Sequence, residues 1–191
     1  MKLAIGGEEK DFAGKVEEAL KGLPELAQRG VKELLKAWTP LHEQQRRLYK
    51  ELNKTAKNDA VTQLLMTAPA IGPATASAYV ATIDDPKRFE SGEKVAAYIG
   101  LTPSIYQSGE TEYRGRITKT GDKMLRWLLV EAAHILLSRS SSDCALKRWG
   151  LKLQQSKGVG KARVAVARRL ACILWKMWKE QETFNPEAMV A

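Results

Sequence analysis

The sequence predicts an all-α fold, and three observations support this prediction. Strand-like alternation of apolar and polar residues is nearly absent along the 191 residues. Apolar residues instead recur at spacings of three and four, as on one face of a helix. Glycine and proline divide the chain into segments of helical length, at Gly22–Pro24, Gly72–Pro73, Gly100–Pro103, Gly109, Gly121 and Gly158–Gly160. We expect a helical or coiled-coil arm over residues 1–58, a compact helical domain over 59–181 and a tail over 182–191.

The arm is predicted from the apolar spacing in residues 31–52. Apolar residues stand at positions 31, 34, 38, 41, 48 and 52, and Gln45 takes the remaining position. This alternation of three and four over three heptads is typical of a coiled-coil seam. Pro40 should kink the helix or mark a new start after Thr39. Two interpretations stay open: an arm that dimerises, and a helical hairpin that packs on its own domain.

The compact domain begins with a helix capped by Asp59, followed by a short turn at Ala70-Ile71-Gly72. Pro73 suits the first turn of a second helix. This arrangement is similar to a helix-hairpin-helix, in which the N–H groups of a Gly-hydrophobic-Gly turn face a DNA phosphate. Ala70 stands at the first glycine position, and a plain helical corner in the core is the alternative.

Several further elements follow along the chain. Asp84 and Asp85 precede Pro86, and this pattern favours a turn over a metal site. A short β-hairpin is expected near residues 105–117, where aromatic and β-branched residues flank a glycine-containing turn. Helices are expected over "GDKMLRWLLVEAAHILL", capped by Thr120 or Thr118, and over "GVGKARVAVARRLACILWKMW".

Positive charge is concentrated in the second half of the chain. The formal net charge is +9. Residues 1–110 hold 15 Lys and Arg and 15 Asp and Glu, whereas residues 111–181 hold 16 Lys and Arg against 5 Asp and Glu. A basic block of this kind is typical of proteins that bind phosphate backbones. A solvated basic face that only keeps a helical assembly protein in solution is the alternative.

Two stretches carry a resemblance to a known family. They are "TAPAIGPATASAYVATIDDPKRFESGEKVAAYIGLTPSIYQSG" and "GRITKTGDKMLRWLLVEAA", within Leu64–Ala133. The motifs in these stretches, and their order, are similar to those of the C-terminal transposase domain of the Piv-like, DEDD-type insertion-sequence transposases. These transposases are described as bridge-RNA-guided. The resemblance implies DNA as the partner and leaves a guide RNA open. It also leaves open a non-catalytic helix-hairpin-helix DNA-binding module or an inactive transposase remnant.

The resemblance also implies roles for single residues. Ser108 of the "QSG" motif would be the nucleophile that attacks a DNA phosphate. The residues expected to bind nucleic acid are Gly72, Thr75, Gly109, Arg114, Arg116, Lys119, Lys123, Arg126, Lys161 and Arg163.

The family's N-terminal RNase-H-like domain, with its metal-binding acids, has no counterpart in this sequence. We therefore expect a fragment that needs that domain for DNA strand exchange. Mg²⁺ is expected only with the acidic domain, and no cofactor is expected in this chain.

The coiled-coil arm would make the protein a homo-oligomer. A cytoplasmic location without membrane contact is expected, because no apolar run reaches the roughly 20 residues that span a bilayer and the two cysteines match no disulfide framework.

Overall fold

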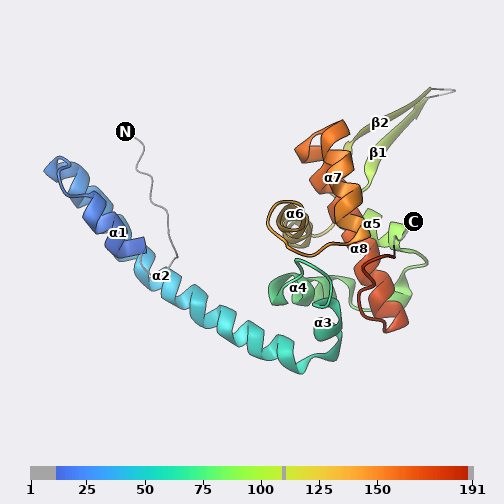
Figure 1. The fold of residues 1–191 in the computed structure, drawn as a ribbon, viewed down its shortest axis with the longest axis horizontal. Helices are drawn as coiled ribbons and strands as arrows, with labels where there is room; N and C mark the ends of the chain where they lie inside the picture. The colour runs from blue at the N-terminus through green and yellow to red at the C-terminus, as the bar shows by residue number, and fades with distance from the viewer. Residues whose placement is uncertain (1–11, 109–110, 189–191) are drawn as a thin grey trace. The chain divides into compact units, whose positions relative to one another are not determined.

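The computed structural model describes residues 12–108 and 111–188. By its contacts the chain separates into two compact units, residues 1–51 and 52–191. The described residues hold eight α-helices and one two-stranded antiparallel sheet, so the predicted all-α class is confirmed (Figure 1). None of the described helices is both long and apolar enough to cross a bilayer.

The first unit is built on helix α1 (Phe12–Ala19) and most of the long helix α2 (Glu25–Asn58). The Phe12 ring lies 4.9 Å from the Trp38 ring, and Trp38 stacks on His42 at 4.6 Å. Helix α2 continues through Pro40, so no new helix begins after Thr39. The proline removes a single main-chain hydrogen bond, and the bonds on either side still hold the helix together.

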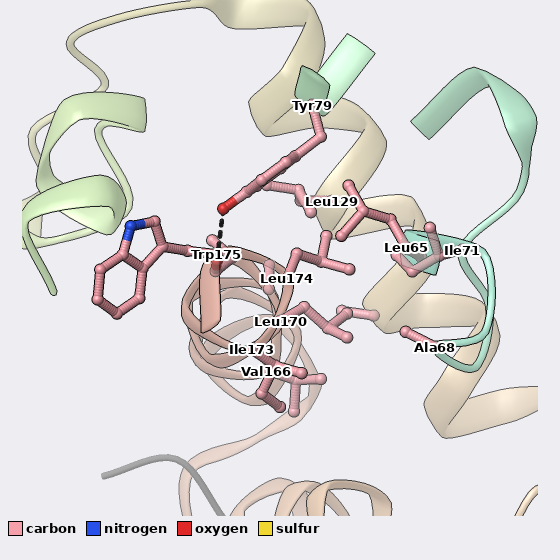
Figure 2. Close-up of a cluster of buried hydrophobic side chains, with 14 of the residues drawn as sticks. Leu65, Ala68, Ile71, Tyr79, Leu129, Val166, Leu170, Ile173, Leu174 and Trp175 are labelled. Atoms are coloured by element: carbon pink, nitrogen blue, oxygen red, sulfur yellow. Dashed lines mark hydrogen bonds between the residues drawn. The ribbon is translucent and has the colours of Figure 1, made fainter. Parts of the chain in front are cut away.

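The second unit is organised around helix α8 (Val159–Glu180). Four helices pack against it, namely α3 (Ala60–Leu65), α5 (Gly92–Ile99), α6 (Lys123–Ser138) and α7 (Ala145–Lys157). The side chains of Val166, Leu170 and Leu174 project from α8 into this core, as Figure 2 shows, and all three are fully buried. Their spacing of four residues keeps them on one face of the helix.

Two long-range hydrogen bonds connect α8 to the middle of the chain. The hydroxyl of Tyr79, on helix α4 (Pro73–Ile83), donates to the Ala171 carbonyl at 2.7 Å (Figure 2). Burial raises the pKa of Tyr79 well above its ordinary value, so the phenol stays a neutral donor. The Trp175 indole N–H donates to the carbonyl of Pro86 at 2.9 Å, in the 3-10 turn η2 (Pro86–Arg88).

The predicted β-hairpin is confirmed and is slightly longer than expected. Strand β1 (Pro103–Ser108) pairs antiparallel with β2 (Thr111–Ile117), and Tyr106 stands opposite Tyr113. An irregularity interrupts the register between Pro103 and Ile105. In Figure 1 the two strands lead away from the helices of the second unit.

Candidate functional site

The base of the hairpin is held by a loop that continues the strand ladder. The Thr118 N–H donates to the Thr102 carbonyl at 2.9 Å, and the Lys119 N–H donates to the Gly100 carbonyl at 3.1 Å. Lys119 adopts a left-handed backbone, with φ of 59°. These contacts hold the Lys119 side chain at the foot of the hairpin, beside the end of α5.

Two glycines allow this loop to cross the end of α5. Gly121 has φ of 75°, and a Cβ there would lie 2.0 Å from the Tyr98 carbonyl oxygen. Gly100 has φ of 79°, and a Cβ there would lie 2.2 Å from the Thr120 carbonyl oxygen. Both the left-handed backbone and the close approach exclude other residues at these two positions.

Arg126 fastens the same loop from helix α6. Its Nη1 donates to the Ile99 carbonyl at 2.9 Å and to the Thr120 carbonyl at 2.8 Å. Asp122 begins the helix, because its carboxylate accepts the Leu125 N–H at 2.6 Å. The expected caps, Thr118 and Thr120, are therefore wrong: both lie outside the helix, in the loop that crosses α5.

A cavity of about 660 Å³ lies where the hairpin base, α5, α7 and α8 meet. Five of the described lining residues are cationic: Arg116, Lys119, Lys161, Arg168 and Arg169. Apolar side chains form much of the remaining wall: Leu101, Pro103, Ile117, Trp149, Val164 and Ala165.

Charge in the cavity is unevenly balanced. Among the described residues that line it, Glu93 carries the one negative charge. Glu93 forms an ion pair with Arg168, whose Nε lies 3.1 Å from the carboxylate. The Arg169 guanidinium lies 5.5 Å from the centre of the Trp149 ring, within reach of a cation–π contact. Arg116, Lys119 and Lys161 are exposed to solvent. An anion could therefore meet several cations here.

The structure brings together three of the residues expected to bind nucleic acid. Arg116 comes from β2, Lys119 from the following loop and Lys161 from the first turns of α8, and all three line the cavity. Lys123 is exposed at the start of α6, and Arg163 is half-buried on α8, but neither lines the cavity. Arg126 is occupied with backbone carbonyls, as described above.

The expected nucleophile lies at the far end of the hairpin. Ser108 is the last residue of β1, and its backbone pairs with Thr111. The hydroxyl of Ser108, the whole of Gly109 and the side chain of Arg114 lie outside the described residues.

The turn expected to resemble a helix-hairpin-helix contains one left-handed residue. Ala70, at the first glycine position, is left-handed with φ of 63°. Gly72 is the N-cap of α4, and Pro73 occupies the first position of the helix. Thr75 is only 7% exposed, so neighbouring residues cover its side chain. Thr75 therefore offers little surface to a ligand.

Sequence analysis missed Trp149 and Glu93 and did not place Arg168 and Arg169 in the site. A helical spacing could have signalled the last two, because Lys161, Arg168 and Arg169 lie at i, i+7 and i+8 on one face of α8. The cavity wall contributed by α7 has no comparable sequence signal.

Acidic residues in the described parts of the chain do not gather into a larger cluster. Within residues 12–108 and 111–188, no group of three or more His, Cys, Asp or Glu side chains is placed to hold a metal ion. The Asp85 carboxylate accepts the Lys87 N–H at 2.8 Å and caps the turn η2, as the turn interpretation predicted.

Comparison with known proteins gives this site a context. Residues 62–149, which include the hairpin and most of the cavity wall outside α8, match the model of the Transposase IS116/IS110/IS902 family. The chain is 32% identical over 141 residues to a "Probable family 20 transposase" of Pseudomonas aeruginosa. It is 34% identical over 136 residues to the transposase for insertion sequence element IS1111A of Coxiella burnetii. It is 32% identical over 148 residues to the transposase for insertion sequence element IS1328 of Yersinia enterocolitica.

These similarities cover most of the chain but a minority of each relative. The matched regions take up 73, 71 and 76% of this chain and 42, 37 and 44% of the three relatives in that order. The chain thus spans less than half the length of the relatives that it matches.

Proposed function

We propose that this chain is a DNA-binding portion of an insertion-sequence transposase. The observation that carries the proposal is the convergence of five cationic side chains on one cavity. Among the described residues that line it, a single acid opposes them, and this acid is already paired with Arg168. Phosphate binding needs such an unbalanced cluster, because each contact replaces a condensed counterion of the DNA. The similarity to insertion-sequence transposases supports the choice of DNA as the polyanion.

Within this proposal, Arg116, Lys119 and Lys161 contact phosphates directly. They are exposed and come from three different elements, so their spacing depends on how the hairpin base is fixed to α8. Arg126 acts as a positioning residue, because its guanidinium holds the loop that carries Lys119. Lys123, Arg163 and the turn at Gly72 would extend the contact along the duplex.

Ser108 is the residue that we propose as nucleophile. Its oxygen would form a bond to phosphorus while the bond from phosphorus to one deoxyribose oxygen breaks. The hydroxyl proton would end on that leaving oxygen, which becomes a free hydroxyl of the cut strand. Serine needs activation for such an attack. By the resemblance, that activation belongs to an acidic domain other than the residues described here.

We further propose that helix α2 pairs with α2 of a second copy. Leu34 and Leu41 are each 71% exposed and Leu48 is 55% exposed, at intervals of seven residues. A heptad stripe of leucine suits knobs-into-holes packing, and Gln45 would set the register. Pairing would cover apolar surface that the first unit leaves in water.

Salt-dependent binding to duplex DNA tests the DNA-binding proposal. The dissociation constant is measured by fluorescence anisotropy from about 50 to 200 mM salt, where each phosphate contact contributes about 0.9 to the log–log slope. Arg116→Ala, Lys119→Ala and Lys161→Ala should each reduce affinity and flatten the slope by about that amount. Lys152→Ala, an exposed lysine on α7 outside the cavity, is the matched control. Affinity that does not change with salt would contradict the proposal.

Covalent capture tests the nucleophile. The chain is mixed with branched DNA, Mg²⁺ and a separately supplied acidic domain, and the protein–DNA adduct is measured after denaturation. Ser108→Ala should abolish the adduct and leave duplex binding intact. Ser104→Ala is the control, since the Ser104 hydroxyl donates to the Arg116 carbonyl at 3.0 Å in the same hairpin. An adduct that survives Ser108→Ala would exclude Ser108.

A further inference from the structure

The cavity between the hairpin base and α8 is more apolar than phosphate binding requires. Phosphates need cations and N–H donors, whereas six apolar residues also line this cavity. Trp149, Ile117 and Val164 are only partly buried and pack against the hydrophobic core. This apolar wall stays in contact with water at the place where DNA is proposed to bind, so a ligand with an apolar face would gain by covering it.

The size and composition of the cavity suit a flat aromatic ligand. Its volume of about 660 Å³ lies within the range of small-molecule sites. Trp149 supplies an indole surface, and bases stack on such rings without regard to sequence. The cations at the rim would meet the negative charge that a nucleotide carries on its phosphates.

We propose that this cavity receives an unpaired base of the DNA strand, with its flanking phosphates on Arg116, Lys119 and Lys161. The inference rests on the DNA-binding proposal above and adds the form of DNA that is bound. Trp149 is the stacking surface, and the guanidinium of Arg169 orients its ring through the cation–π contact. DNA is chosen over RNA because of the similarity to insertion-sequence transposases.

This arrangement predicts a preference for DNA with a base outside the stack. In a fully paired duplex, a base reaches the cavity only after unpairing and unstacking, which are unfavourable. In a duplex with one extrahelical base, that base is already unpaired and unstacked, so this free energy is not lost on binding. The chain should therefore bind the second form more tightly, and the gain should come from the cavity alone.

The test compares two duplexes that differ only in one extrahelical 2-aminopurine. We expect the chain to bind the bulged duplex about tenfold more tightly, because the extrahelical base gains one stack on an aromatic ring. The fluorescence of 2-aminopurine should fall on binding, because the base stacks on Trp149. A single-stranded RNA of the same sequence is the competing ligand.

Variants assign the preference to the cavity. Ala165→Trp should fill the cavity and Trp149→Ala should remove the stacking surface, and in each variant the bulged and the paired duplex should bind equally well. Trp149→Phe should retain most of the preference. Trp127→Ala is the matched control, since Trp127 is 59% exposed on α6 and lies outside the cavity. A thermal melt of each variant checks that it is folded.

Each outcome has a distinct meaning. Equal binding of the two duplexes by the unchanged chain overturns the base site and leaves the DNA-binding proposal standing. A preference that persists in folded Ala165→Trp and Trp149→Ala also overturns it. Tighter binding of the RNA strand overturns the choice of DNA. If the unchanged chain shows no salt-sensitive binding to either duplex, the DNA-binding proposal is overturned, and the base site with it.

Discussion

Helices α8 and α2 have similar apolar patterns and opposite surroundings. In α8, Val166, Leu170 and Leu174 follow a helical spacing and are fully buried. In α2, Leu34 and Leu41 follow a spacing of seven and remain mostly exposed. The comparison teaches that apolar periodicity establishes an apolar face, whereas only the tertiary structure decides whether the chain covers that face itself.

The difference lies in which segments reach each helix. Helix α8 is surrounded by α3, α5, α6 and α7, which come from most of the second unit. Tyr79, on α4, adds a hydrogen bond to its backbone from 92 residues away (Figure 2). In the first unit the short helix α1 contacts α2 through the rings of Phe12 and Trp38. An eight-residue helix cannot cover the leucine stripe along three heptads of α2.

The largest expected effect is on the free energy of unfolding, when a buried leucine of α8 and an exposed leucine of α2 are each replaced by alanine. Leu170→Ala should lower the free energy of unfolding by about 2–5 kcal/mol, because it opens a cavity in a packed core. Leu41→Ala should change it by less than about 0.5 kcal/mol in dilute protein, as for an exposed position. Urea denaturation of both variants at the same low concentration measures the contrast.

Protein concentration sharpens this comparison further. If α2 pairs with a second copy, Leu41→Ala should weaken self-association in sedimentation equilibrium and become destabilising as concentration rises. Gln44→Ala, an exposed position of α2 outside the predicted seam, is the control. A Leu41→Ala variant that associates like the unchanged chain would contradict the pairing proposal.

Two glycines should show the same contrast at a smaller scale. Gly92→Ala on α5 should destabilise the fold by about 1–3 kcal/mol, as overpacking does. Its Cβ would lie 2.8 Å from the Cys172 Cβ and 2.9 Å from the Cys172 Cα on α8. Gly30→Ala in α2 has no atom within 4 Å of the new Cβ. It should stabilise by about 0.5–1 kcal/mol, because glycine is unfavourable inside a helix.

Thermal unfolding of the two variants measures these opposite signs. A stabilised Gly92→Ala variant would show that α5 can move away from α8 at little expense. A destabilised Gly30→Ala variant would show that a neighbour covers this part of α2.

The smallest effect should come from the turn before α4. Ala70→Gly should stabilise by about 0.5 kcal/mol, because a left-handed non-glycine residue costs about 1–2 kcal/mol and glycine loses about 0.5–1 kcal/mol of chain entropy in return. Ala74→Gly, inside α4, should instead destabilise by about 1 kcal/mol. Chemical denaturation distinguishes the two. Ala70 is partly buried against the hydrophobic core, so a loss of stability in Ala70→Gly would show that this contact outweighs the strain of the left-handed backbone.

Much of the fold could be predicted from the sequence, because its causes are local. The apolar spacing in α2 and α8 and the turn residues around the hairpin act within a few neighbours along the chain. Asp59 was predicted as a helix cap, and its carboxylate accepts the Thr62 N–H at the start of α3. The excess of basic residues after position 110 is likewise a property of composition alone.

The candidate site could be predicted only in part, because its causes are distant in sequence. Arg116, Lys119 and Lys161 were named for their charge, but their convergence depends on the close crossing at Gly100 and Gly121. Arg126 has the same charge, but its guanidinium donates to the carbonyls of Ile99 and Thr120 and so holds the loop in place.

The sequence by itself determined the helices, the hairpin and the basic half of the chain, since short-range periodicity and turn chemistry set these. Only the tertiary structure decided that α8 is covered and the leucines of α2 are not. It also decided that Trp149 and five cations share one cavity. Those outcomes depend on contacts between segments far apart in sequence, which no local pattern encodes.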